Sequence, residues 1–96
     1  MNWFETIKVR FPHGSTGHPV EEILRSASIS SPIPGLKEVK LYRNAALATD
    51  LCLTLLWERK SLPVQGTALG LCVAESLKEF GMVHHAVWVQ ETLPQG

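Results

Sequence analysis

A chain of 96 residues is long enough for one domain with one hydrophobic core, so we expect residues 1–96 to form a single domain. Hydrophobic residues make up 45% of the chain, too many for a disordered protein. Nine basic residues balance nine acidic ones, and the net charge of zero argues against nucleic acid as a partner. It also leaves little repulsion between two copies.

Targeting and membrane signals are missing from the sequence. The first residues contain no basic segment followed by an apolar run, as a signal peptide would. The longest near-apolar stretch, Leu51–Trp57, is far shorter than the roughly 20 residues of a membrane helix. We therefore expect a cytoplasmic protein without membrane contact. In that reducing compartment Cys52 and Cys72 should be free thiols, with a disulfide between them as the alternative.

The first half of the chain predicts a strand, a helix and a second strand. Polar and apolar residues alternate from Thr6 to Phe11, which is the pattern of a strand with one apolar face. A glycine-containing loop follows, and Pro19 opens a helix whose apolar residues recur at helical spacing up to Ala27. Prolines and a glycine then end the helix, and alternation over Leu36–Arg43 predicts the second strand.

The second half predicts a strand, a helix and a final strand. Asp50–Glu58 is apolar on both faces, which is typical of a central strand covered on both sides. An apolar stripe predicts a helix from about Gly66 to Phe80, and Met82–Glu91 alternates as the last strand. The order βαββαβ predicts an α+β fold, a ferredoxin-like sandwich with both helices on one face of a four-stranded antiparallel sheet. The expected strand order is four, one, three, two.

Two helices cover only one face of such a sheet, so the other face needs a second cover. Whichever parity of Asp50–Glu58 meets the helices, the opposite parity still exposes apolar side chains. Soluble proteins rarely expose a patch of that kind. We predict a two-fold homodimer formed sheet to sheet, which would bury about 800 Å² on each partner.

The same segments resemble a known superfamily. The strand Asp50–Glu58 ending in Trp-Glu, the helix that stops at Gly81, and the last strand with Val87-Trp88-Val89 look like the dimeric α+β barrel proteins. These include antibiotic-biosynthesis-monooxygenase-like, stress-responsive A/B barrel and muconolactone-isomerase-like proteins. The resemblance covers nearly the whole chain in element order and length, and it includes no catalytic signature. It implies the ferredoxin-like fold and a homodimer.

One candidate site follows from strand parity. His84 and His85 are neighbours on a strand and so point to opposite faces. Residues of one parity on the four strands can line a common cavity, in which a histidine could exchange protons near neutral pH. The expected lining consists of Thr6, Lys8, Tyr42, Thr54, His84 and Trp88, on a parity that a single bulge would reverse.

The resemblance adds one candidate catalytic residue and argues against one of the superfamily's activities. Monooxygenases of the superfamily carry Asn, Trp, Tyr or His around their cavity, which implies a catalytic role for Trp57 beside His84 and Tyr42. The second predicted helix lacks a histidine matching a haem ligand, which speaks against haem degradation. We expect no cofactor and no metal, because His13 and His18 have no third ligand nearby in sequence.

Two functions remain open from the sequence. The first is a cofactor-independent monooxygenase- or isomerase-like enzyme that acts on an aromatic small molecule, with His84 or Tyr42 moving a proton. The second is a non-catalytic dimeric module that binds a ligand or regulates, similar to ACT domains. A cavity of ligand size would favour the first, and a fully packed interior would favour the second.

Overall fold

The computed structural model describes residues 2–12, 22, 25 and 33–94. Its elements in chain order are β1 (Asn2–Arg10), β2 (Leu36–Arg43), β3 (Asp50–Glu58), α2 (Ala68–Leu77) and β4 (Met82–Val89). β2 and β3 have the bounds that the sequence predicts, while α2 and β4 are shorter than expected. The helix predicted from Pro19 to Ala27 lies almost entirely outside the described residues.

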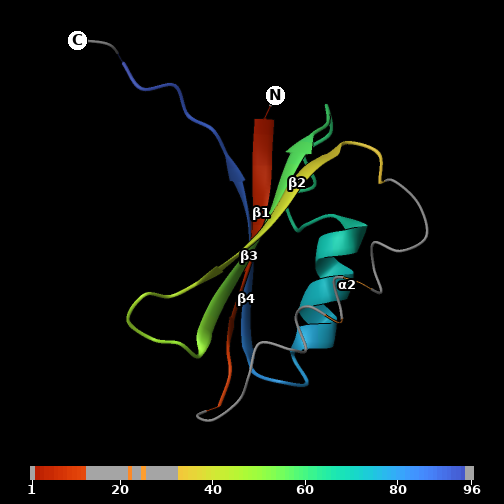
Figure 1. Ribbon diagram of the computed structural model, residues 1–96. Helices are drawn as coiled ribbons and strands as arrows, with labels where there is room; N and C mark the ends of the chain where they lie inside the picture. Colours follow the sequence, from red (N-terminus) through yellow and green to blue (C-terminus); the bar gives the residue numbers. More distant parts are fainter. Residues whose placement is uncertain (1, 13–21, 23–24, 26–32, 95–96) are drawn as a thin grey trace.

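The four strands form one antiparallel sheet in the order β2-β3-β1-β4. This confirms the predicted order and places β1 and β3, the two most deeply buried strands, at the centre. Helix α2 packs across one face of the sheet (Figure 1). The described part of the chain therefore has two layers and one open sheet face, as the ferredoxin-like arrangement requires.

Strand β1 begins at Asn2, four residues before the start that alternation predicts. The side chains of Trp3, Glu5 and Ile7 all lie in the interior. Because Glu5 is polar, the inward-facing positions before Ile7 are not uniformly apolar. The alternation of polar and apolar residues is therefore recognisable in the sequence only from Thr6.

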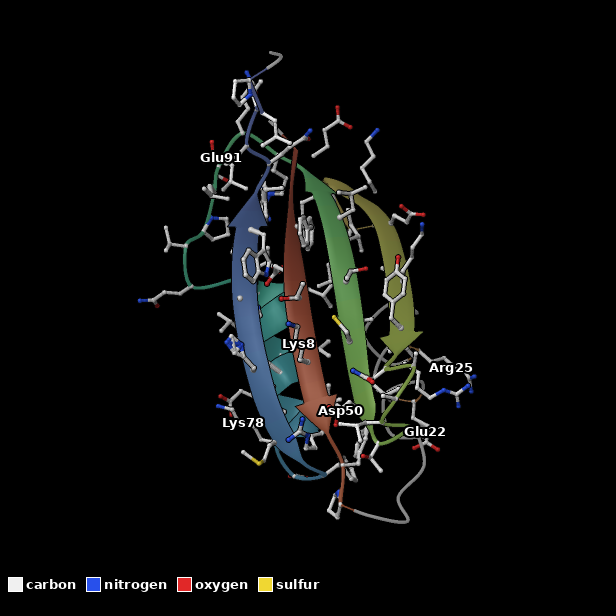
Figure 2. All side chains as sticks on the ribbon, turned by 90° about the vertical axis from the view of Figure 1, so that its left-hand side faces the viewer. Lys8, Glu22, Arg25, Asp50, Lys78 and Glu91 are labelled. Atoms are coloured by element: carbon white, nitrogen blue, oxygen red, sulfur yellow. The ribbon has the colours of Figure 1, made fainter. Side chains whose placement is uncertain are left out.

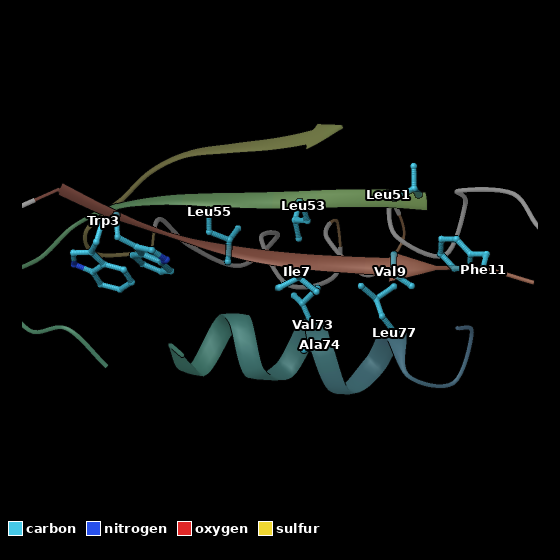
Figure 3. Close-up of a cluster of buried hydrophobic side chains, with 11 residues drawn as sticks. Trp3, Ile7, Val9, Phe11, Leu51, Leu53, Leu55, Val73, Ala74 and Leu77 are labelled. Atoms are coloured by element: carbon cyan, nitrogen blue, oxygen red, sulfur yellow. The ribbon is translucent and has the colours of Figure 1, made fainter. Parts of the chain in front are cut away.

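The core lies between the sheet and α2 (Figure 3). Its buried side chains come from alternate positions of the two central strands and from one face of the helix: Trp3, Ile7, Val9, Phe11, Leu51, Leu53, Leu55, Trp57, Val73, Ala74 and Leu77. The rings of Trp3 and Trp57 stack with centroids 5.8 Å apart. Each large side chain buried here stabilises the fold by about 1.5–3 kcal/mol.

A buried carboxyl group connects the layers. Glu5 of β1 has no exposed surface and accepts hydrogen bonds from Trp57 Nε1 at 2.8 Å and from the backbone N–H of Thr67 at 3.0 Å. The Thr67 hydroxyl also donates to Glu5, and His85 Nε2 lies 2.6 Å from Glu5 Oε2. One side chain of β1 thus binds β3, β4 and the residue before α2.

Thr67 has a second role as the N-cap of α2. Its hydroxyl oxygen accepts a hydrogen bond from the backbone N–H of Gly70 at 3.0 Å, which satisfies one of the free donors of the first turn. Gly70 lies directly against Glu5, and a Cβ at position 70 would collide with both carboxyl oxygens. The helix can approach the sheet this closely only because residue 70 has no side chain.

We expect Gly70→Ala to destabilise the fold by about 1–3 kcal/mol, because the added methyl group overpacks the space around Glu5. Helix propensity alone would stabilise the variant by about 1 kcal/mol, so the two effects have opposite signs. Urea denaturation followed by circular dichroism measures the change. Glu75→Ala on the exposed side of α2 is the control and should shift stability by less than about 0.5 kcal/mol. A Gly70→Ala protein as stable as the wild type would contradict the close packing.

Within the described residues, no helix is both long enough and apolar enough to cross a membrane.

Candidate functional site

The sheet face opposite α2, here called the open face, carries mostly polar and aromatic side chains. Figure 2 views the molecule from this side, with Lys8 near the middle of the sheet and the helix behind it. Since Glu5, Ile7 and Val9 point into the core, the even-numbered residues of β1 point outward. The strand pairings extend this parity to the other three strands.

Four side chains form a row across all four strands of the open face. Tyr42 on β2 pairs with Cys52 on β3, Cys52 pairs with Lys8 on β1, and Lys8 pairs with His84 on β4. Neighbouring strands lie about 4.8 Å apart, so this row spans roughly 14 Å from Tyr42 to His84. It combines a phenol, a thiol, an ammonium group and an imidazole.

A pocket of about 480 Å³ lies over this row. We call it the open-face pocket. It is lined by the four residues of the row, and by Val9, Arg10, Arg43, Asn44, Asp50, Leu51, Met82 and Val83. The volume falls within the range of small-molecule sites, roughly 300–1,000 Å³. The pocket lies toward the end of the sheet where β1 and β2 finish and β3 and β4 begin.

An ion pair closes one side of the pocket. Arg10 Nε and Nη2 each donate to a different carboxylate oxygen of Asp50, both at 2.8 Å. These bonds lower the pKa of Asp50 below its ordinary value and raise that of Arg10. The two charges therefore balance each other within the pair.

Cys52 contributes a neutral thiol. Partial burial raises the pKa of Cys52 above its ordinary value, and the nearby Lys8 ammonium only partly offsets this. The thiol therefore stays protonated at neutral pH and is a poor nucleophile. Cys52 and Cys72 are both free, which confirms the sequence prediction and excludes the disulfide.

The remaining residues of the predicted lining also lie on the open face. Thr6 and Thr54 pair with each other one row beyond Lys8 and Cys52. Trp88 donates its Nε1–H to the Thr6 hydroxyl at 2.8 Å, and its ring stacks on Phe4 with centroids 6.4 Å apart. The structure thus brings Thr6, Lys8, Tyr42, Thr54, His84 and Trp88 to one face, although only Lys8, Tyr42 and His84 line the pocket.

Trp57 lies on the other side of the sheet. Its side chain is buried in the core and donates to Glu5, so the sheet separates it from Tyr42 and His84. The three residues predicted to be catalytic are therefore not brought together. The two adjacent histidines do point to opposite faces, with His84 in the pocket and His85 against Glu5.

Sequence reasoning missed two residues. Cys52 lines the pocket, and it shares the parity of Thr54, which was the signal available to find it. Glu5 carries the interior network, and its only signal was an acidic residue within an apolar series. His13 and His18 lie outside the described residues, and among those described no three metal-ligating side chains cluster.

Comparisons with known proteins identify the fold. No family model and no curated protein matches the chain. Solved structures do match. A variant of SnoaB, a cofactor-independent oxygenase from Streptomyces nogalater, superposes with a TM-score of 0.65 at 17% identity, covering 98% of each chain. Rv0793 from Mycobacterium tuberculosis gives 0.63 at 12% identity, covering 99% of this chain and 100% of that one.

A third structure, a putative antibiotic biosynthesis monooxygenase from Chloroflexus aurantiacus, gives a TM-score of 0.56 at 17% identity, covering 100% of this chain and 95% of that one. These likenesses extend over essentially the full length of each protein. The chain therefore has the fold of the antibiotic-biosynthesis-monooxygenase-like proteins, which confirms the resemblance seen in its element order. At such low identity the likeness shows the fold alone, and any activity depends on the residues of the site.

We expect Cys52 to react slowly with iodoacetamide at pH 8, because its raised pKa leaves little thiolate. Lys8→Met should slow the reaction further, since removing the ammonium removes the influence that lowers the pKa of Cys52. Mass spectrometry of the peptides measures the rate. Lys60→Met, which removes a charge from the loop after β3, is the control and should change nothing. Faster alkylation of Cys52 in Lys8→Met would refute this electrostatic coupling.

Proposed function

We propose that this protein is a cofactor-independent enzyme of monooxygenase or isomerase type that acts on an aromatic small molecule in the open-face pocket. The observation that carries the proposal is the row of Tyr42, Cys52, Lys8 and His84 across the floor of a pocket of ligand size. The fold supports it, because SnoaB is described as a cofactor-independent oxygenase.

The row contains the groups needed to remove a proton from a substrate. Oxygenation without a cofactor and isomerisation can both start from a deprotonated substrate, since a carbanion or phenolate is far more reactive than the neutral compound. His84 is the candidate base, because imidazole accepts protons near neutral pH. Lys8 is its direct cross-strand neighbour and can stabilise the negative charge that develops.

Tyr42 and Met82 supply contacts for the rest of the substrate. Tyr42 is 51% exposed and Met82 is 77% exposed, so both can lose accessible surface when an aromatic ring binds. The Tyr42 hydroxyl stands at the opposite end of the row from His84 and can donate a hydrogen bond to a substrate oxygen. Tyr42 therefore orients the substrate or returns a proton to it.

We expect His84→Ala to lower turnover of an aromatic substrate about 100-fold or more, because the variant lacks the base. Its thermal unfolding should match that of the wild type, since His84 lines a pocket outside the core. Lys78→Ala on the helix side should keep full activity. Oxygen uptake and nuclear magnetic resonance of the substrate, measured over a panel of phenols and polycyclic quinols, report oxygenation and isomerisation respectively.

The alternative is a dimeric module that binds a ligand without transforming it. Saturable binding of panel compounds in isothermal titration calorimetry, weakened in Tyr42→Ala, together with no turnover of any of them, would favour that alternative. Equal turnover by His84→Ala and wild type would reject His84 as the base.

We further propose that the protein is a homodimer whose partner packs on the open face. Phe4, Leu56 and Trp88 lie in one row of that face, and Trp88 is 48% exposed in the single chain. Covering this row would remove apolar surface from water, which favours association. The open-face pocket lies farther along the sheet and would then sit beside the interface, toward its rim. The free cysteines support a cytoplasmic location.

We expect the wild type to elute as a dimer at micromolar concentration and Leu56→Asp to elute as a monomer, because the new carboxylate would be buried in the interface. Size-exclusion chromatography with light scattering measures the mass. Leu71→Asp places the same change on the exposed side of α2 and should remain dimeric. A monomeric wild type would contradict the sheet-to-sheet dimer.

A further inference from the structure

The carboxylates of the open face form ion pairs with basic side chains other than Lys8. Asp50 binds Arg10 through two hydrogen bonds of 2.8 Å, Glu38 lies 3.2 Å from Lys40, and Glu58 pairs with Lys37. These are the three carboxylates of the open face among the described residues of the strands. Each already has a basic partner, and among the described residues none lies within ion-pair distance of Lys8.

The position of Lys8 makes this surplus charge significant. Its cross-strand neighbours are the neutral thiol of Cys52 and the imidazole of His84, and along its own strand it lies between Thr6 and Arg10. Lys8 therefore stands on a central strand, on the floor of the open-face pocket, and no carboxylate of the described residues pairs with it. A molecule that fills the pocket takes water away from this ammonium, so a negative group on that molecule would be favoured at Lys8.

The described strand residues of a second copy bring no unpaired carboxylate to this face. In a two-fold dimer the partner presents the same face, with the same three paired carboxylates and another surplus lysine. The negative charge that Lys8 lacks among the described residues would then come from a molecule that occupies the pocket.

We infer that the open-face pocket binds an aromatic carboxylate, with its anionic group at Lys8 and its ring on the side chains of Tyr42 and Met82. The inference rests on the proposed function and narrows its substrate class from aromatic molecules to aromatic acids. A carboxylate matches the single point charge of Lys8. Of the two guanidinium groups that line the pocket, that of Arg10 is bound to Asp50, and Arg43 has the opposite parity on β2, where its strand partner is the buried Leu51.

The same arrangement assigns Lys8 two effects on the substrate. Its ammonium holds the carboxylate in the middle of the row, within one strand spacing of His84 on β4. This position fixes the ring beside the imidazole, so that the acid group orients the molecule for proton removal. A neutral aromatic compound of the same shape would lack that anchor and bind in several orientations.

The test uses 2-naphthoate and its neutral isostere 2-naphthamide, with affinities measured by isothermal titration calorimetry on the dimer or whatever assembly the protein forms. We expect 2-naphthoate to bind at least tenfold more tightly than 2-naphthamide, and the difference to shrink as salt is added. Lys8→Met, which keeps the length of the side chain, should lose that tenfold preference and leave 2-naphthamide binding unchanged. Lys8→Arg should retain most of the preference for 2-naphthoate, and Lys60→Met should retain all of it.

Alkylation provides a second readout that does not depend on activity. Bound 2-naphthoate should protect Cys52 from iodoacetamide by a factor that follows its occupancy, while the exposed Cys72 on α2 reacts at an unchanged rate. This protection should disappear in Lys8→Met at the same naphthoate concentration.

The outcomes separate the inference from the function on which it rests. Equal affinity for the two probes, or a preference that survives Lys8→Met, would overturn the acid-binding inference and leave an aromatic site intact. Binding of neither probe up to millimolar concentration, without protection of Cys52, would overturn both the inference and the proposed aromatic site.

Discussion

The buried carboxyl group of Glu5 is the interaction on which the described structure depends. It accepts hydrogen bonds from Trp57 and from Thr67, and it contacts His85, so it joins β1 to β3, β4 and the start of α2. Leaving such a group without partners costs about 1–3 kcal/mol, and more if it is charged. A one-residue slip of β1 would move Glu5 to the open face and Lys8 into the core. The network therefore fixes the register of the central strand.

That register divides the sheet into two chemically different faces. On the helix side, a polar network is completely satisfied and enclosed by apolar packing, which stabilises and specifies the fold. On the open face, Lys8 and His84 share a pocket with Tyr42 and no such closed network forms. Adjacent residues consequently have separate roles, since His85 contributes to the interior and His84 stands where a small molecule can reach it.

The fold by itself is compatible with many activities, because structures at 12–17% identity share the arrangement of elements and little of the sequence. The activity of this chain has to follow from the residues of its open face. A surplus ammonium group, an imidazole and a phenol lie in one row, and the carboxylates around them are already paired. The proposed preference for an aromatic acid depends on this charge balance more than on the shape of the face.

The sequence by itself determined the period of each strand, and with it the four strands, the helix between the last two, the strand order in the sheet and the opposite directions of His84 and His85. It also placed Lys8, Tyr42 and His84 on a common face, because side chains alternate with a period of two. Only the tertiary structure decided which face met the helix. Glu5 and Trp57 belong to the core through hydrogen bonds between residues distant in the chain, and no local pattern encodes such contacts. The ion pairs Arg10–Asp50 and Lys37–Glu58 likewise depend on the sheet register, because they join neighbouring strands, whereas Glu38 and Lys40 lie two residues apart on β2.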